Sequence, residues 1–578
     1  MPYIAPLAEM RFVLEEVAAF GDNAPADLRE AILSEAGRFA ENVLAPLNQP
    51  ADRAGSRLEN GVVRTPAGFA EAYANYVAGG WNGLALSPEY GGQGLPQALS
   101  TAVVEMWNAA CMSWALCPLL TSGAAQLLEA YGSAEQKRIY LAKLVSGEWT
   151  GTMNLTEPQA GSDLGAVRTR AVPHRDGNWG NHYRLTGQKI FITYGDHDLA
   201  PNIVHFALAR TPDAPAGSRG LSLFLVPKFL PDQEGRPGAR NGVRTLRLEE
   251  KLGIHASPTC VLAYEDAVGW RIGDEDRGLA VMFMLMNNAR LGVGVQGLAI
   301  AERAYQAARD FARARVQGKP LGAESEGLPI LYHPDVRRML AWMRAAIAAM
   351  RALAYYAAGL CDRGRDDPAG AHQRRADLLI PVVKAWCTDL GVLVASTAIQ
   401  VHGGMGYIEE TGAAQHLRDA RIAPIYEGTN GIQANDLVGR KLAQDGGEAV
   451  RALIAEMRET AAAASTPDLA GIGRALTAAI AALESATAHL LRADPAEAAA
   501  GSAPYLSLFG TVVGGWLLLR LARAAAHRNA ADAPDRAFLA ARRAIARVYA
   551  EQFLATAPGQ LAAVTGGRTV LDFPPDLL

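Results

Sequence analysis

The sequence predicts an α+β fold of several domains, in which helical domains flank a β domain. Three observations support this prediction. The chain has 578 residues, which is more than a single hydrophobic core usually supports. Apolar residues in its first and last parts recur at the three- and four-residue spacing of amphipathic helices. Between these parts lie short apolar runs separated by Gly, Pro, Asn and Asp, a pattern typical of strands.

The composition argues against several classes of protein. The formal net charge is −4 and the pI is about 6.3, so the chain has no overall positive field and nucleic acid is not an expected partner. The five cysteines show no CxxC spacing, which favours a reducing compartment over a disulfide framework. The first residues lack a basic segment followed by an apolar run, as a secretory signal has. We therefore expect a cytoplasmic protein.

The first predicted domain, residues 1–148, is helical. Phe12, Leu14 and Val17 follow the spacing of one helix face. Residues 81–95 interrupt the helices with a run rich in Gly, Pro and Ser, which predicts a loop.

The second predicted domain, residues 149–270, consists of strands. Its strand-like runs are residues 183–186, 189–193, 203–208 and 221–226. Residues 227–241 are rich in Gly, Pro and charge and are predicted to leave the domain as a surface excursion.

The third predicted domain, residues 271–445, returns to helical spacing. Its periodic segments are residues 298–315, 336–360 and 376–400, whose lengths suit a helical bundle.

The last predicted domain, residues 446–578, is an additional helical domain, rich in Ala and Arg, with a break at residues 493–504. The apolar run 511–519 is well short of the ~20 residues that a membrane span requires, so it predicts a buried helix.

Two motifs lie in the β domain. Residues 153–163 read MNLTEPQAGSD, which by itself describes an ordinary turn. Residues 187–193 read GQKIFIT, and the alternation of a strand places Phe191 and Thr193 on one face. One face thus offers an aromatic ring and a hydroxyl together.

A third motif supplies arginines. Arg290 ends the run NNAR, and Arg315 and Gln317 lie in the run RARVQGK. A planar guanidinium suits bidentate contacts to phosphate, although isolated arginines of this kind usually lie solvated on a helix face.

The fourth motif surrounds Glu427. It joins the glycine-rich run QVHGGMGY, residues 400–407, to the run IAPIYEGTNG. Gly428 permits a tight turn before Thr429 or Asn430 caps the next helix, so Glu427 is predicted to lie on a turn between helices. A carboxylate in that position removes a weakly acidic proton when burial raises its pKa.

Together, these motifs resemble the acyl-CoA dehydrogenase family over about residues 80–440. The resemblance implies FAD as cofactor and an acyl-CoA thioester as substrate. It also implies that Glu427 takes the α-proton while a hydride leaves the β-carbon for the flavin, which gives a trans-2-enoyl-CoA. Some relatives carry this base at the position of Asn288 or Ala289, where the chain has no carboxylate.

The resemblance also assigns binding residues. The residues that match flavin-binding positions are Leu155, Thr156, Phe191, Thr193, Arg315, Gln317, Gln400, Gly403, Gly404 and Thr429. The residues that match substrate-binding positions are Ser162, Arg290, Tyr426 and Gly428. Arg315 and Gln317 resemble residues that reach the FAD of a neighbouring subunit, so we expect a homodimer or tetramer. The chain has Phe191 where Trp is frequent and lacks the Phe that often follows the residue matching Gln317.

Other features resemble one bacterial subgroup of the family. They are residues 3–12, the insertion before residue 249 and the extra domain after residue 445. The subgroup includes 3-methylmercaptopropionyl-CoA dehydrogenases, which act in dimethylsulfoniopropionate breakdown, and fatty acyl-CoA dehydrogenases. We expect oxidation of 3-methylmercaptopropionyl-CoA to methylthioacryloyl-CoA, with a medium- or long-chain fatty acyl-CoA as the alternative, because nearly isosteric apolar groups change binding only modestly.

Two further readings stay open, an acyl-CoA oxidase and a non-catalytic scaffold on the same fold. An electron-transfer flavoprotein is the expected acceptor of electrons. No metal site is expected, since His402 has no ligand-spaced partners.

Overall fold

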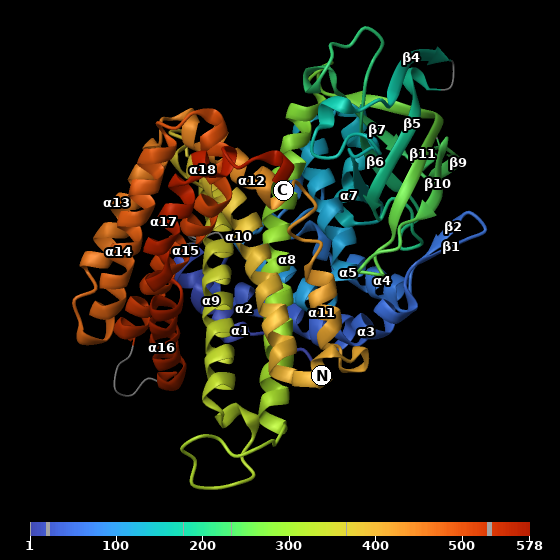
Figure 1. Cartoon of the computed structure of the whole chain (residues 1–578). Coiled ribbons are helices and arrows are strands. Elements are labelled where there is room, and N and C mark those ends of the chain that lie inside the picture. The colour runs from blue at the N-terminus through green and yellow to red at the C-terminus, as the bar shows by residue number, and fades with distance from the viewer. Residues whose placement is uncertain are drawn as a thin grey trace.

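A computed structural model describes residues 2–18, 24–176, 179–232, 234–365, 367–528 and 535–577. The sheet lies at the upper right in Figure 1 and long helices form the centre. The C-terminal helices lie at the left, on the side of the central helices that faces away from the sheet. The predicted α+β architecture is therefore confirmed.

The N-terminal part is helical, as predicted. Its helices are α1 (Leu7–Val13), α2 (Ala26–Phe39), α3 (Ala45–Ala54), α4 (Phe69–Ala78), α5 (Gln97–Tyr131), α6 (Ala134–Gln136) and α7 (Ala142–Ser146). The two-stranded hairpin of β1 (Arg57–Glu59) and β2 (Val62–Arg64) was not predicted from the sequence. Residues 81–95 form a loop with two short 3-10 turns, so that prediction is also confirmed.

The β domain contains one seven-stranded sheet in the order β3-β6-β7-β11-β5-β4, with β10 also paired to β11. The strands are β3 (Thr150–Asn154), β4 (Arg170–Asp176), β5 (Gly180–Thr193), β6 (Ile203–Ala209), β7 (Ser222–Pro227), β10 (Val243–Leu248) and β11 (Thr259–Ile272). The predicted excursion at residues 227–241 folds as a small hairpin of β8 (Phe229–Pro231) and β9 (Pro237–Arg240). All four β9 residues are exposed.

The central bundle contains α8 (Gly278–Ala314), α9 (Pro334–Gly364), α10 (Ala371–His402), α11 (Ala413–Ala420) and α12 (Asn430–Asp436). Helices α8 and α10 approach closely at Gly297 and Gly391. A Cβ added to Gly297 would lie 2.5 Å from the Cys387 carbonyl oxygen, and one added to Gly391 would lie 2.6 Å from the Gly297 carbonyl oxygen. Only glycine fits at these two places, so α10 is held close against α8.

The C-terminal helices are α13 (Glu448–Ala462), α14 (Pro467–Leu490), α15 (Pro495–Arg528), α16 (Arg536–Gln552), α17 (Ala557–Thr565) and α18 (Gly567–Leu571). The predicted break at residues 493–504 is wrong, because it is much longer than the break in the structure. Helix α15 begins at Pro495 and continues through Pro504, so only a short turn separates it from α14. The first turn of a helix lacks internal partners for its N–H groups, which makes Pro495 a suitable start.

Five described helices, α5, α8, α10, α14 and α15, are long and apolar enough to cross a membrane by length and composition alone. In the most apolar stretch of each helix, between 50% and 89% of the stretch is buried inside the protein. Residues 511–519 belong to α15, which is 34 residues long, so the sequence underestimated this apolar element. Its predicted burial is confirmed, because Trp516 is fully buried.

A buried cluster of charges joins helices from distant parts of the chain. Arg351 on α9 is fully buried and donates to Glu105 on α5 at 2.6 Å and to Glu302 on α8 at 2.8 Å. Glu9 on α1 lies 3.2 Å from Arg351 and 2.5 Å from Arg542 on α16. Burial acts to raise the pKa of Glu9, but Arg344, Arg542 and Arg351 together hold it well below its usual range. The cluster ties the C-terminal helices to the first helix.

The change Arg542→Ala is expected to destabilise the protein by about 3–5 kcal/mol, because it leaves Glu9 buried with one partner fewer. Equilibrium urea denaturation at neutral pH measures this loss. Because the pKa of Glu9 is lower in the folded state, its pairing stabilises the fold above the usual glutamate pKa and that contribution is lost as the pH falls. The difference between variant and wild type should therefore shrink in acid.

The neighbouring residue provides the control. Arg543 pairs with Asp468, whose side chain is 57% exposed, so Arg543→Ala should change stability by only ~0–1 kcal/mol. Equal losses for the two variants would contradict a structural role for the buried cluster.

Candidate active site

A cavity of about 530 Å³ lies between the β domain, α8 and the turn that precedes α12. A volume of this size is ordinary for a site that binds a cofactor or small molecule. Ten of the residues predicted from the sequence line it: Leu155, Thr156, Ser162, Phe191, Thr193, Arg290, Tyr426, Glu427, Gly428 and Thr429. Segments more than 270 positions apart in the chain thus meet in one place.

The segment that carries Leu155 and Thr156 is fixed to β5 by a buried ion pair. Lys189 donates to Glu157 at 2.8 Å and to the Leu155 carbonyl at 3.0 Å. The N–H of Ile190 donates to the Thr156 carbonyl at 2.9 Å. Burial lowers the pKa of Lys189 to about 8, although Glu157 favours its charged form. These bonds keep the backbone of the segment at the rim of the cavity.

Phe191 presents an aromatic ring to the cavity. Its φ is +59°, in the left-handed region, and the register between β5 and β11 shifts beside it. The side chain is 60% exposed although it lines a cavity. Thr193 lines the same cavity, as the predicted shared face requires. Phe191 thus combines a strained backbone with an exposed ring, and the hydroxyl of Thr193 belongs to the same wall. This arrangement fits a flat ligand that covers the ring.

Glu427 lies on a turn between α11 and α12, as predicted. The N–H of Asn430 donates to the Pro424 carbonyl at 2.9 Å and closes the turn. Glu427 and Gly428 have φ values of +57° and +82°, so the turn has two successive left-handed residues. Thr429 is the residue that caps α12, because its hydroxyl accepts a bond from the Ile432 N–H at 3.2 Å. The turn directs the carboxylate into the cavity.

Burial raises the pKa of Glu427 to about 7, while the charges of Lys384 and Arg290 act to lower it. In the described part of the chain, its carboxylate accepts no hydrogen bond and its backbone N–H donates none. A base with this pKa is largely ionised slightly above neutral pH and still accepts a proton readily.

Lys384 and Asn430 also belong to the site, although the sequence predicted no site role for Lys384 and only a candidate capping role for Asn430. Lys384 on α10 is fully buried and donates to the Asn430 side chain at 2.8 Å. Asn430 in turn donates to Asp389 at 2.7 Å and to the hydroxyl of Thr388 at 3.0 Å. The signal in the sequence was a single charged residue within the apolar run LLIPVVKAWC. Burial lowers the pKa of Lys384 to about 7, and Glu427 opposes that shift.

Arg290 lies inside the protein rather than on a helix surface. Its side chain is 4% exposed and donates to Asp436 at 3.1 Å. The Nε atom is buried and has no hydrogen-bond partner among the described residues. Arg290 therefore places a positive charge and one unused donor beside Glu427.

The other five predicted residues, Arg315, Gln317, Gln400, Gly403 and Gly404, do not line this cavity. All five are exposed, at the C-terminal ends of α8 and α10. These two ends are neighbours, because the rings of Phe311 and His402 lie 4.6 Å apart. A Cβ added to Gly403 or Gly404 would meet no atom within 4 Å. Within one chain, the predicted cofactor residues thus form two separate groups.

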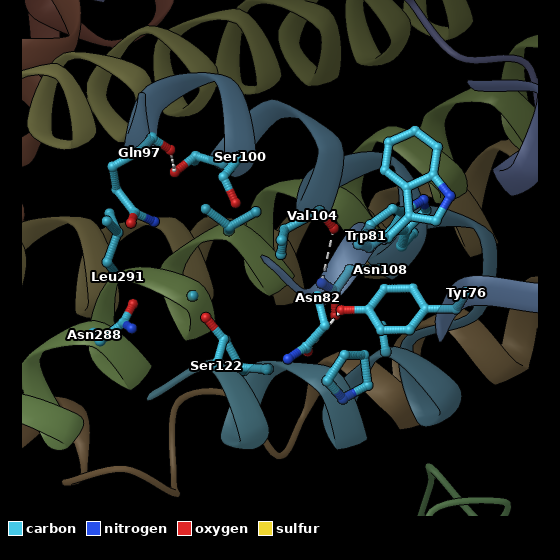
Figure 2. Close-up of a pocket in the computed structure, with 17 residues that line it drawn as sticks. Tyr76, Trp81, Asn82, Gln97, Ser100, Val104, Asn108, Ser122, Asn288 and Leu291 are labelled. Carbon is cyan, nitrogen blue, oxygen red and sulfur yellow. Dashed lines mark hydrogen bonds between the residues drawn. The ribbon is translucent and has the colours of Figure 1, made fainter. Parts of the chain in front are cut away.

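A second, smaller cavity of about 50 Å³ lies between α5 and α8 and shares no lining residue with the first (Figure 2). Trp107 Nε1 and Asn108 Oδ1 are buried there and have no hydrogen-bond partner among the described residues. The space suits a few water molecules, at ~10–15 Å³ each. Asn288 lines this small cavity, so its side chain is not directed at the site of Glu427.

The fold and the cavity together define a flavin-dependent oxidoreductase. Models of the acyl-CoA dehydrogenase N-terminal, middle and C-terminal domains match residues 27–148, 152–267 and 276–442. A model described as acetyl-CoA dehydrogenase C-terminal like matches residues 453–574. The chain belongs to the acyl-CoA dehydrogenase family, and its cofactor is FAD.

Similar proteins span nearly the whole chain. The 3-methylmercaptopropionyl-CoA dehydrogenase of Ruegeria pomeroyi is 47% identical over 98% of both chains. A broad-specificity linear acyl-CoA dehydrogenase of Mycobacterium tuberculosis is 34% identical over 91% of this chain and 90% of its own. The structure of Caenorhabditis elegans ACDH-11 with C11-CoA has a TM-score of 0.79 and 23% identity, and covers 99% of this chain and 96% of its own. This last likeness shows the shared fold.

Replacing Lys384 by Met is expected to raise the pKa of Glu427, because the variant removes a nearby positive charge that favours the carboxylate. The acid limb of the pH profile of kcat/KM should move upward by ~1 pH unit. Steady-state rates with an acyl-CoA between pH 5.5 and 9 measure the shift.

Lys441→Met is the matched control. Lys441 pairs with Asp377 at 3.2 Å and is not one of the charges that shift the pKa of Glu427, so its removal should leave the acid limb in place. An unchanged profile for Lys384→Met would show that Lys384 does not tune the base.

Proposed function

We propose that Glu427 is the base of an FAD-dependent α,β-dehydrogenation of acyl-CoA thioesters. The observation that carries the proposal is the position of this carboxylate: it lies on the wall of the large cavity and has a pKa of about 7. The residues around it suit FAD. Phe191 offers a ring face, and Thr156 and Thr193 offer hydroxyls. In the separate exposed group, the backbone at Gly404 is open to close approach.

The residues of this chain act on the acyl group in three ways. The Glu427 carboxylate accepts the proton of the α-carbon, and its own backbone N–H is available to polarise the thioester carbonyl. Arg290 and Lys384 keep a share of the base ionised. FAD, when bound, supplies the acceptor for the hydride that leaves the β-carbon. Apolar side chains such as Leu155 and Ile425 line the cavity and help to exclude water.

For the specific substrate we propose 3-methylmercaptopropionyl-CoA, with methylthioacryloyl-CoA as product. The support is the 47% identity over the full length to a protein named for that activity. Such a role would place the protein in the breakdown of dimethylsulfoniopropionate.

A linear acyl-CoA is the second candidate. The relative from Mycobacterium tuberculosis, at 34% identity over 91% of the chain, is named for broad specificity toward linear acyl-CoA. A thioether sulfur and a methylene differ little in size and polarity, so one apolar pocket binds both with modest discrimination.

Anaerobic bleaching of the bound flavin tests both proposals. Wild type and Glu427→Gln are each mixed with 3-methylmercaptopropionyl-CoA, butyryl-CoA, octanoyl-CoA and palmitoyl-CoA. The variant should keep flavin and bind acyl-CoA but lose at least ~10³-fold in bleaching rate, since the amide accepts no proton. Near-normal rates in the variant would rule out Glu427 as the base.

The order of bleaching rates among the four acyl-CoA compounds decides between the two candidate substrates. Fastest bleaching by the thioether supports the proposed substrate, and fastest bleaching by a plain chain supports the linear candidate. Glu249→Gln, which changes another carboxylate on the cavity wall, is the control and should retain most of the rate.

We also propose that electrons leave to an electron-transfer flavoprotein in the cytoplasm and that the enzyme is a homodimer or tetramer. The exposed group of Arg315, Gln317, Gln400, Gly403 and Gly404 supports an assembly, because a partner subunit would complete its contacts. Large exposed apolar side chains gather on the same segments: Val316, Leu321, Tyr332, Met405, Tyr407 and Ile408. Peroxide formation in place of flavoprotein reduction would favour an oxidase.

The change Tyr407→Asp is expected to weaken the assembly and the retention of FAD together, because Tyr407 is 85% exposed and an interface would have to bury the new charge. Light scattering and the flavin-to-protein ratio measure the two effects. An exposed apolar residue elsewhere, Leu252, supplies the control Leu252→Asp. A wild type that is monomeric with FAD bound would overturn the proposal.

A further inference from the structure

One group of side chains in the β domain has the composition of a metal site. His174 and Asp176 on β4 and His182 on β5 lie with one ligand atom from each within 4.8 Å of one another. It is the one such group found among the described residues. The hairpin lies at the edge of the sheet, since β4 pairs only with β5 in the strand order.

The strand register produces this arrangement. His174 pairs directly with His182 across the hairpin. Asp176 is two residues beyond His174, so both project from the same face of β4. The two imidazole rings have their centroids 5.0 Å apart. The sequence concealed the group, because the spacing from His174 to His182 matches no common ligand pattern until the hairpin folds.

The surroundings of His182 suit a metal ligand. Its side chain is fully buried, and its Nε2 atom has no hydrogen-bond partner among the described residues. The other ring nitrogen, Nδ1, lies 3.1 Å from the Gly180 carbonyl, so it donates there. This leaves Nε2 with a bare lone pair. A histidine that binds a metal through one nitrogen and donates the other to a backbone carbonyl has this same arrangement.

The distances also fit a cation better than a direct bond. Nε2 of His182 lies 3.8 Å from Oδ2 of Asp176, too far for a hydrogen bond. Two ligands at ~2.0–2.2 Å from a tetrahedral zinc ion lie roughly 3.4 Å apart. His182 and Asp176 are therefore already near the spacing of two zinc ligands. A small movement of the exposed His174, whose ligand atom lies within 4.8 Å of theirs, would complete the site.

Arg184 competes for Asp176, but it has another partner. Its guanidinium lies 3.5 Å from Asp176 and also 3.5 Å from Asp266. A divalent cation at Asp176 would leave Arg184 paired with Asp266. The N–H of Trp179 donates to the other Asp176 oxygen at 2.8 Å, which orients the carboxylate.

We propose that His174, Asp176 and His182 bind one divalent cation of the zinc class, with a water molecule in the fourth position. Two imidazoles and one carboxylate are a ligand set that zinc accepts. The ion would tie the edge strand β4 to β5. Phe191, the nearest cavity residue along β5, is nine residues from His182, or roughly 30 Å of extended chain. The site is thus structural and separate from catalysis.

Zinc titration of the untagged, chelator-treated, FAD-loaded protein tests this proposal. Isothermal titration calorimetry with zinc chloride should show one ion per chain and a zinc-dependent rise in Tm. His174→Gln should weaken binding by more than the ~10-fold that loss of an outer partner causes, because it removes a direct ligand. His174 is exposed, so this variant should fold normally.

His372→Gln is the matched control. His372 is a half-buried histidine that lies 3.0 Å from Asp367, and no third ligand joins this pair among the described residues, so its removal should leave zinc binding unchanged. Absence of stoichiometric zinc binding in wild type would overturn the proposal. Binding that survives His174→Gln unchanged would overturn it as well.

Discussion

The buried charge cluster around Arg351 constrains the positions of the helices that build the rest of the molecule. Arg351 is fully buried, so it must find carboxylates from neighbouring helices, and it finds them on α1, α5 and α8. Breaking one pair leaves a charge in a low-dielectric interior, which disfavours other helix arrangements. Helices α5 and α8, which line both cavities, are thereby fixed relative to each other and to the C-terminal helices through Arg542.

In the candidate active site, too, buried charges depend on one another. Glu427, Lys384 and Arg290 are three ionisable groups that share a poorly solvated region. Burial moves the pKa of Glu427 up and that of Lys384 down, so both lie near 7, while each charge favours the ionised form of the other. Asn430 connects Lys384 to the turn that carries Glu427. Its side chain accepts a hydrogen bond from Lys384, and its backbone N–H closes the turn. Residues from two helices therefore position Glu427 and shift its pKa.

Local sequence patterns predicted the secondary structure well where the helical spacing of apolar residues was long and regular. The helical segments at residues 336–360 and 376–400 lie within α9 and α10, and the segment at residues 298–315 runs one residue past the end of α8, since long amphipathic periodicity is hard to mistake. The pattern failed where tertiary contacts overrode local preference. Pro504 suggested a break but lies inside α15, and the β1–β2 hairpin carries only three residues per strand. Proline within a buried helix is tolerated when packing offsets the lost hydrogen bond.

The sequence by itself determined the order of domains, the family motifs and the turn at Glu427, because these depend on local periodicity and on residues with special backbone preferences. Only the tertiary structure decided which of the predicted residues meet. It separated the group of Arg315 and Gly404 from the cavity and brought Lys384 beside Glu427. The physical reason is that desolvation and Coulomb interactions depend on distances between segments far apart in the chain, and no local pattern encodes those distances.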